Sequence, residues 1–356
     1  MSELEDLDEF DLEEADLELE EDVELETTSK KKSKKIEGVS DLPGVGPTTA
    51  KKLSENGFDS LMSIAAASVA ELTSIASLGS KTAVKMIETA RESLNLSFVT
   101  ASDVLETRKN MAKITTGAQS LDTLLGGGIE TGAMTEMYGE FRTGKTQIAH
   151  QLCVTCQLPK SEGGLRGEGD EDEGPVKIVY LDSEGTFRPE RILNMASRFP
   201  SLDPQEVLKN ILVGRCYNSD HQITLAEKVA KDAQSDNIKL LVVDSIISHF
   251  RAEYVGRGTL ADRQQKLNQH IHTLLRIAEV NNLAVLATNQ VHAKPDQFFG
   301  DPTAPVGGHV VAHAAQTRIM LRKSKGNRRI ARIADSPLLP ESEGIYQILE
   351  DGIFDG

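Results

Sequence analysis

The stretch GEFRTGKT at residues 139–146 restricts the possible folds of this chain more than any other feature. An apolar run that ends at Tyr138 precedes it, and a helical pattern that begins near Lys145 follows it. Phosphate needs many donors in a small space, and backbone N–H groups converge on it only where glycines such as Gly139 and Gly144 remove the Cβ obstruction. The order of strand, glycine turn and helix therefore favours a nucleotide-binding P-loop over a plain surface turn.

The residues of this P-loop have separate expected tasks. The positive N-terminal end of the helix faces the phosphates, Lys145 reaches the β and γ phosphates, and the Thr146 hydroxyl is placed for Mg²⁺. We therefore expect ATP and Mg²⁺ as cofactors. The P-loop and the residue after it are expected to bind ATP. These residues are Gly139, Glu140, Phe141, Arg142, Thr143, Gly144, Lys145, Thr146 and Gln147.

A second apolar run, LLVVDS at residues 240–245, ends in an acid. A buried strand that ends in Asp244 delivers a carboxylate to the sheet edge, where it orients water bound to Mg²⁺. Any buried strand can end in Asp, but together with the P-loop the pattern indicates the Walker B residue. We expect Thr146 and Asp244 to form the metal site.

Hydrolysis also needs a group that positions or deprotonates a water in line with the γ-phosphate. The candidate is Glu184, at the tip of KIVYLDSEGTF, a strand that we expect beside the P-loop strand. Asp182, at the end of the same strand, is the alternative. A third run ends in LATNQ, where the Gln290 amide is a candidate sensor of the γ-phosphate, although amides at strand ends are also common loop residues.

The strand pattern from Thr115 onward predicts an α/β fold. Apolar runs recur at 177–181, 238–243 and 283–288 with helical stretches between them, and strands that are apolar throughout are buried on both faces, as in a parallel sheet. We expect a P-loop ATPase core with helices on both faces of a twisted sheet. The polar, Gly-rich segment 163–175 is expected to be an exposed loop.

Residues 38–96 are expected to form a small helical module. LPGVGPTTAKKL places Gly44 and Gly46 in a turn before a helix, and a looser echo, SLGSKTAVKMI, follows at 77–87. This pattern is typical of a helix-hairpin-helix element, whose turn presents backbone amides to a DNA phosphate without reading sequence. The alternative is a plain helical turn whose glycines only relieve crowding.

The charge of the chain is concentrated at its N-terminus. The formal net charge is −16, yet residues 1–29 hold fifteen Asp and Glu and no Lys or Arg, which leaves 40 acidic and 39 basic residues elsewhere. The body is therefore near neutral, and DNA binding is not excluded. We expect residues 1–37 to be a disordered acidic tail and a basic hinge. The tail is either a solubilising extension or a segment that competes with DNA or docks a partner.

Other sequence features limit the class of protein. Three cysteines are too few for a disulfide framework, and no second pair completes a zinc site with Cys153 and Cys156. There is no signal peptide and no apolar run near 18 residues, so we expect an intracellular protein with no membrane partner.

Further ordered blocks carry a specific resemblance. Together with the motifs above, they closely resemble the RadA family, the archaeal and eukaryotic relatives of the RecA strand-exchange recombinase, over about residues 38–356. The blocks are SLDTLLGGGIETG (120–132), DSEGTFRPER (182–191), AEYVGRGTLADRQ (252–264), NQV (289–291), GGHVVAH (307–313) and DSPLLPE (335–341).

This resemblance implies roles for single residues. Glu184 matches the catalytic glutamate of the family and acts with Lys145 and Gln290, while Arg191 matches the arginine that packs on adenine. Asp335 and Pro340 match a segment that covers ATP from the adjacent subunit. In FVTA, Phe98 and Ala101 match the polymerisation motif, in which the linker adds a strand to a neighbour's sheet and the Phe fills a pocket there.

The resemblance also places two DNA-binding loops. The first is expected over residues 251–262, with Arg251, Arg257 and the following Arg263, and the second over residues 291–308, with Lys294 and Phe298. Arginines neutralise phosphate and an apolar side chain wedges between bases, which suits sequence-independent binding of single strands. The basic run at 322–332 is expected either to join the DNA groove or to bind the acidic tail.

The resulting interpretation is a RecA-like P-loop ATPase core (114–356) that follows a small all-α helix-hairpin-helix domain (38–96) and a linker with the polymerisation motif (97–113). We expect an ATP-dependent recombinase that binds single- and double-stranded DNA and exchanges strands. It is expected to form filaments or rings and to bind recombination mediator proteins. Its expected location is the cytoplasm if archaeal and the nucleus if eukaryotic. A mediator paralogue without pairing activity and a RecA-like hexameric helicase are the alternatives.

Overall fold

The computed structural model describes residues 36–76, 78–109, 111–169, 174–233, 235–293 and 303–356. The acidic tail and most of the basic hinge predicted from the sequence lie outside these residues, as does the middle of segment 291–308.

The N-terminal residues form a helical module with its own core. Gly46 and Gly79 are the N-cap residues of α1 and α4, so each of the two glycine motifs begins a helix, as the sequence predicts. Leu53, Ile64 and Met86 are fully buried in the hydrophobic cluster of this module. Its elements are η1 (Val39–Asp41), α1 (Pro47–Ser54), α2 (Leu61–Ala65), α3 (Val69–Ala76) and α4 (Ser80–Ser93).

The linker has more structure than its sequence suggests. Residues 96–100 are irregular and exposed, and Ala101 begins the exposed helix α5 (Ala101–Lys109). After it, β1 (Lys113–Ile114) pairs antiparallel with β2 (Ile129–Glu130), and α6 (Gln119–Leu124) lies between the two strands in the chain. The predicted polymerisation motif thus ends where a helix starts.

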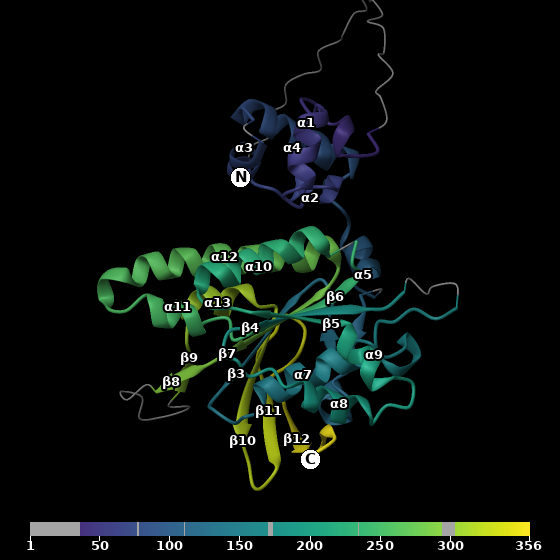
Figure 1. Ribbon diagram of the computed structural model, residues 1–356, viewed down its shortest axis with the longest axis vertical. Helices are drawn as coiled ribbons and strands as arrows, with labels where there is room; N and C mark the ends of the chain where they lie inside the picture. Colours follow the sequence, from purple (N-terminus) through teal and green to yellow (C-terminus); the bar gives the residue numbers. More distant parts are fainter. Residues whose placement is uncertain (1–35, 77, 110, 170–173, 234, 294–302) are drawn as a thin grey trace, which may run out of the picture. The chain divides into compact units, whose positions relative to one another are not determined.

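One large mixed sheet organises the core (Figure 1). Its order is β13-β12-β11-β10-β3-β7-β6-β4-β5, parallel from β10 to β5 and antiparallel from β10 to β13. The strands are β3 (Met134–Gly139), β4 (Lys177–Asp182), β5 (Ile211–Arg215), β6 (Ile238–Asp244), β7 (Ala284–Asn289), β10 (Thr317–Lys323), β11 (Arg328–Asp335), β12 (Glu343–Leu349) and β13 (Gly352–Asp355).

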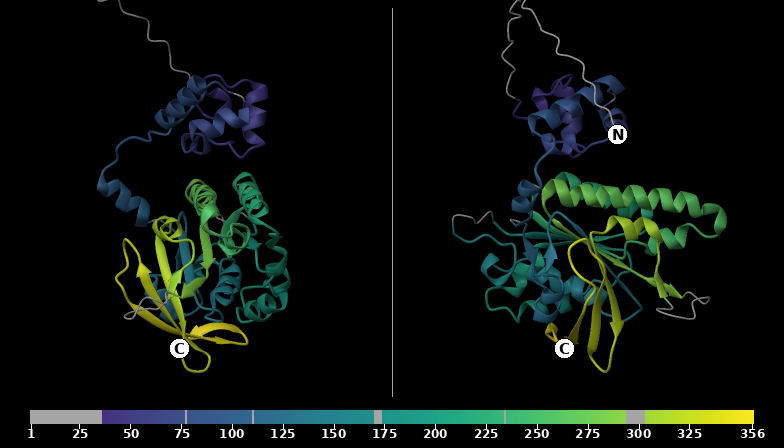
Figure 2. Two further views of the ribbon diagram at one scale, coloured as in Figure 1. Left: turned by 90° about the vertical axis from the view of Figure 1, so that its left-hand side faces the viewer. Right: turned by 180° about the vertical axis from the view of Figure 1, so that it is seen from behind.

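Helices cover both faces of this sheet, as the two-sided apolar strands predict (Figure 2). Along β4, Ile178 and Tyr180 belong to one hydrophobic cluster while Val179 and Leu181 belong to the other, because successive side chains point to opposite faces. The first cluster includes residues of α7 (Lys145–Thr155), α8 (Pro189–Ala196) and α9 (Pro204–Lys209). The second includes residues of α10 (Ser219–Asp232), α11 (Ser248–Glu253), α12 (Leu260–Asn281) and α13 (His309–Ala314).

The remaining elements are short. They are η2 (Lys160–Glu162), η4 (Arg257–Thr259), and the antiparallel pair β8 (Val291–Ala293) and β9 (Thr303–Pro305).

The structure corrects three expectations. The strand that carries Glu184 is not beside the P-loop strand, because β7 and β6 lie between β3 and β4. The predicted exposed loop 163–175 is partly buried at its start, where Gly164 and Leu165 pack against the core. The first predicted DNA loop is shorter than 251–262, because Arg251 is in α11 and Asp262 is in α12.

Candidate functional site

The P-loop connects β3 to α7. Gly144, the N-cap residue of α7, has φ +108°, which a side chain would strain, and a Cβ on Gly139 would lie 2.2 Å from the carbonyl oxygen of Leu321. The hydroxyl of Tyr346, from β12, donates to the Thr143 carbonyl at 2.9 Å. The loop is thus fixed from outside, with its glycines where side chains are excluded.

Lys145 lies against the P-loop backbone. Its Nζ donates to the carbonyl oxygens of Gly139 at 2.8 Å and Glu140 at 3.0 Å. Burial lowers the pKa of Lys145, and the carboxylates of Asp244 and Glu184 oppose this shift. The ammonium is therefore partly desolvated, which strengthens its attraction for an anion.

Asp244 ends β6 and is buried among hydroxyl donors. Thr146 donates to its Oδ2 at 2.8 Å, Tyr180 donates to the same oxygen at 2.6 Å, and Thr288 donates to Oδ1. These donors come from α7, β4 and β7. Tyr180 was not singled out from the sequence, where its position in an apolar strand gave it only a packing role.

Glu184 and Asp182 lie in different environments, one exposed and the other buried. The Asp182 carboxylate is buried and accepts the backbone N–H groups of Glu184, Gly185, Thr186 and Phe187 at 2.7–3.3 Å. It therefore caps the turn after β4. Glu184 is exposed, and its Oε1 accepts hydrogen bonds from Ser245 at 2.9 Å and from Gln290 at 2.7 Å.

The Gln290 contact links two parts of the chain. Gln290 follows β7 and immediately precedes β8, and its backbone carbonyl accepts the N–H of Val306, just after β9, at 2.9 Å. The side chain that contacts Glu184 thus lies at the base of segment 291–305.

These residues line one cleft of about 700 Å³. It contains every predicted P-loop residue except the buried Thr143, together with Glu184, Asp244 and Gln290. Arg188 and Arg329 also line it and were not predicted there. Arg329 belongs to the basic run at 322–332, which the sequence predicts either to join the DNA groove or to bind the acidic tail. Its Nε donates to the Arg142 carbonyl at 3.2 Å.

Besides Thr143, three more predicted ATP residues lie outside the lining of this cleft: Arg191, Asp335 and Pro340. The Arg191 guanidinium uses the N–H donors along its edge in hydrogen bonds within the chain. Its Nε donates to Gln147 at 2.7 Å, and its terminal nitrogens donate to the carbonyls of Leu349 and Glu350. Asp335 is the last residue of β11.

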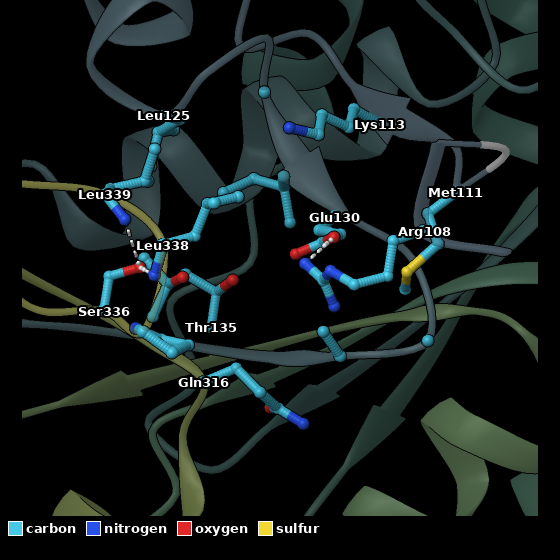
Figure 3. Close-up of a pocket in the computed structure, with 16 residues that line it drawn as sticks. Arg108, Met111, Lys113, Leu125, Glu130, Thr135, Gln316, Ser336, Leu338 and Leu339 are labelled. Carbon is cyan, nitrogen blue, oxygen red and sulfur yellow. Dashed lines mark hydrogen bonds and ion pairs between the residues drawn. The ribbon is translucent and has the colours of Figure 1, made fainter. Parts of the chain in front are cut away.

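The chain between Asp335 and Pro340 borders a second, smaller cavity of about 90 Å³ (Figure 3). The hydroxyl oxygen of Ser336 accepts the N–H groups of Leu338 and Leu339 at 3.4 and 3.2 Å, which closes a turn in this segment. Arg108 of α5 forms an ion pair with Glu130 of β2 at 2.9 Å on the same cavity. The predicted ATP-covering segment and the end of the linker therefore share one cavity.

The predicted polymerisation residues lie on the surface. Phe98 is fully exposed and Ala101 is exposed at the start of α5. At the sheet edge, β5 borders an apolar cavity of about 230 Å³ lined by Val179, Leu181, Leu212, Val213 and Leu225 among others. Leu212 and Val213 are exposed large apolar side chains.

The predicted DNA-binding residues lie in several places. Gly44 has φ +83° in the turn before α1, Arg251 is exposed, and Arg263 is half-buried. The side chain of Arg257 and the residues Lys294 and Phe298 lie outside the described part of the chain.

The described residues include three free thiols. Cys153, Cys156 and Cys216 are free and buried. No group of three or more His, Cys, Asp or Glu suited to a metal ion occurs there, and no helix there has both the length and the apolar character to cross a membrane.

Family models and curated relatives both match this chain to recombination proteins. The Rad51 family model matches residues 107–356, and a SAM-like helix-hairpin-helix tandem model matches residues 36–92. A DNA repair and recombination protein RadA of Aeropyrum pernix is 53% identical over 322 residues, covering 90% of this chain and 98% of that protein. A protein of the same description from Metallosphaera sedula is 52% identical over 323 residues, covering 90% and 97%.

Proposed function

The chain belongs to the Rad51 family, and from this premise we propose how its residues bind ATP, assemble and contact DNA. It is a RecA-like recombinase of DNA repair and recombination and a DNA-dependent ATPase, with an N-terminal helix-hairpin-helix domain. The observation that carries the proposal is the 2.7 Å hydrogen bond from Gln290 to Glu184, because it joins the nucleotide cleft to the base of segment 291–305.

The proposed ATP site is built on the P-loop. The N-terminal end of α7 and the Lys145 ammonium supply positive charge for the phosphates. The restricted positions of Gly139 and Gly144 fit this role, since side chains there would meet neighbouring atoms. Mg²⁺, when bound, would neutralise charge on the β and γ phosphates. Thr146 and Asp244 would hold it, and the Thr146 hydroxyl would still donate its hydrogen bond to the Asp244 carboxylate.

Glu184 is the proposed catalytic residue for hydrolysis. Its carboxylate is exposed in the cleft, whereas the Asp182 carboxylate is already engaged by backbone N–H groups. Glu184 would orient and deprotonate a water, and Gln290 would report the state of the γ-phosphate. In the proposed site Arg191 presents the face of its guanidinium to adenine, because its edge is held by Gln147 and two carbonyls.

Assembly is proposed to complete the site. Asp335 and Pro340 would cover ATP bound to an adjacent subunit, since they lie outside the cleft of their own chain. The residues around Phe98 would pair with the open edge of β5 in a second copy, and the Phe98 ring would enter the apolar cavity beside that strand. Burying one Phe contributes roughly 2–3 kcal/mol.

DNA contacts are proposed at separate places. The amides around Gly44 and Gly46 would hold a backbone phosphate, Arg251, Arg257 and Arg263 would neutralise phosphates, and segment 291–308 would contact a single strand through Lys294 and Phe298. Recombination mediators are the further proposed partners, and the cytoplasm is the proposed location, in line with the archaeal relatives.

A strand-exchange assay beside ATPase and duplex-unwinding assays tests the proposal. We expect exchange without unwinding, ATPase stimulated by single-stranded DNA, and loss of both activities in Lys145→Ala. Glu184→Gln should bind ATP and DNA but hydrolyse at least about 100-fold more slowly, as expected for loss of a general base. Unwinding without exchange, or full hydrolysis by Glu184→Gln, would contradict the proposal.

A further inference from the structure

Glu136 is a carboxylate buried inside the central sheet. It lies on β3 with no exposed surface, and its Oε2 accepts a 2.7 Å hydrogen bond from Nε of Arg318 on β10, its register partner. Removing two charges from water costs about as much as their attraction returns, so a buried ion pair is not by itself a reason for stability. What else Glu136 contacts is therefore informative.

The other Glu136 oxygen holds Asn289, at the end of β7. Nδ2 of the fully buried Asn289 donates to Oε1 of Glu136 and to the carbonyl oxygen of Val306, each at 2.7 Å. A carboxylate and a carbonyl only accept, so this pair of contacts requires the NH₂ group of the amide at this position. Oδ1 of Asn289 has no hydrogen-bond partner among the described residues, so the amide orientation is set by Nδ2 alone.

Val306 is in turn held at both of its backbone groups. Its carbonyl accepts from Asn289, and its N–H donates to the Gln290 carbonyl at 2.9 Å. Val306 follows β9 while Asn289 and Gln290 precede β8, so these bonds join the two ends of segment 291–305 at one point (Figure 1). The Gln290 side chain continues from that point to Glu184.

We propose that Arg318, Glu136 and Asn289 form a positioning unit, the Glu136 clamp, which couples segment 291–305 to Glu184. The clamp fixes Asn289, Asn289 fixes Val306 against Gln290, and Gln290 thereby keeps its amide on the catalytic carboxylate. None of its three members lines the nucleotide cleft. The inference rests on the proposed function, in which this segment contacts DNA and Glu184 serves hydrolysis.

Two variants test the clamp. Asn289→Ala removes both donors and leaves the ion pair, whereas the double variant Glu136→Met with Arg318→Met replaces the pair by apolar side chains of similar length. The double variant should keep its melting temperature close to that of the unmodified protein. In both, the stimulation of ATPase by single-stranded DNA should fall by about five-fold or more, the lower end of a typical coupling between sites. Stimulation at the unmodified level in the folded double variant would overturn the proposal.

A matched control lies next to the same pair of strands. Gln316, labelled in Figure 3, immediately precedes β10, and its Oε1 accepts the N–H of Met134 at the start of β3 at 2.8 Å. Gln316→Leu therefore removes one side-chain bond beside the β10–β3 pair and leaves the bonds of Asn289 to Glu136 and Val306 in place. It should retain DNA stimulation. An equal loss of stimulation in this control would show that any weakening of the strand pair is sufficient and would overturn the clamp.

A readout without DNA separates this inference from the proposed function. Hydrogen exchange of the Val306 amide should respond to a non-hydrolysable ATP analogue in the unmodified protein, and the response should disappear in both clamp variants. If the unmodified protein shows no DNA stimulation while Val306 still responds, the proposed function fails and the clamp stands. If Val306 responds equally in all variants, the clamp fails.

Discussion

Tyr180 donates a 2.6 Å hydrogen bond to Oδ2 of Asp244, the oxygen that also accepts from Thr146. The phenol is fully buried, and its ring packs against His150 at 5.6 Å and Phe187 at 5.0 Å between centroids. Burial, reinforced by Asp244, raises the pKa of Tyr180 well above its usual range, so its proton remains on the phenol. In the proposed metal site, Tyr180 would hold the Asp244 carboxylate in place while Thr146 and Asp244 would supply the oxygens for Mg²⁺.

We therefore expect Tyr180→Phe to weaken metal use more than folding. A hydrogen bond to a charged group contributes about 1.5–3 kcal/mol. Loss of this one should lower the ATPase rate by about ten-fold at low Mg²⁺, with partial recovery at high Mg²⁺. A Mg²⁺ titration of ATPase beside a melting curve measures both effects.

Tyr346→Phe is the matched control for this change. It also removes a buried phenol that donates one hydrogen bond, but the acceptor is the Thr143 carbonyl and not Asp244. Because its acceptor is neutral, Tyr346→Phe should lose about 0.5–1.5 kcal/mol in the free energy of unfolding. Only Tyr180→Phe should shift the Mg²⁺ dependence. Identical Mg²⁺ curves for the two variants would remove Tyr180 from the metal site.

The carboxylate that ends β4, Asp182, and the one that follows it, Glu184, should differ in their effect on stability. Asp182→Asn replaces an acceptor-only group that binds four successive N–H groups, so we expect a loss of roughly 1–3 kcal/mol in the free energy of unfolding. Glu184→Gln leaves an exposed side chain with the same shape and should unfold like the unmodified protein. Urea unfolding of both variants decides this, and equal destabilisation would contradict it.

The sequence predicted which residues line one cleft better than it predicted the order of the strands around them. Gly139–Gln147 and the carboxylates are specified by motifs with fixed spacing, because phosphate and metal chemistry permits few arrangements. The three apolar runs predicted β4, β6 and β7, and Lys325-Gly326-Asn327 lies at the turn of the antiparallel β10–β11 pair, as expected of a hairpin.

Strand order was the weaker part of the prediction. Apolar runs show that strands are buried but not which neighbours they have, so β4 was expected beside β3 although β7 and β6 lie between them. The roles of Tyr180 and Glu136 were missed for a related reason. Both lie within strands, and only the register brings Tyr180 to Asp244 and Glu136 to Arg318 and Asn289.

Self-association should depend on one exposed ring. Removing the contribution of Phe98 by Phe98→Glu should weaken assembly by at least about 30-fold, since burial of a Phe contributes roughly 2–3 kcal/mol and 1.4 kcal/mol is ten-fold. Leu212→Glu, in the cavity beside β5, should have the same effect from the opposite side. Light scattering or sedimentation over a concentration series measures it.

Val99→Glu controls for the added charge. Val99 is also exposed, and in the strand that this segment would add to a neighbour's sheet its side chain would point to the face opposite that of Phe98. Its effect on assembly should be smaller than that of Phe98→Glu. Equal effects of the two variants would mean that charge repulsion, and not loss of the ring, weakens assembly.

Two buried histidines should make stability depend on pH. Burial lowers the pKa of His150 and of His270 to about 4, against an ordinary value of 6.5. The unfolded chain therefore binds protons that the folded chain does not, so stability is complete above about pH 6.5 and is lost as the pH falls toward 4. Each histidine contributes a slope of about 1.4 kcal/mol per pH unit within that window.

His270→Leu should reduce the measured slope by this amount, whatever its effect at pH 7.5. His272→Leu, at an exposed position of the same helix, measures the general effect of the replacement. Urea unfolding between pH 7.5 and 4.5 gives the slopes, and an unchanged slope in His270→Leu would show that its burial does not govern the acid response.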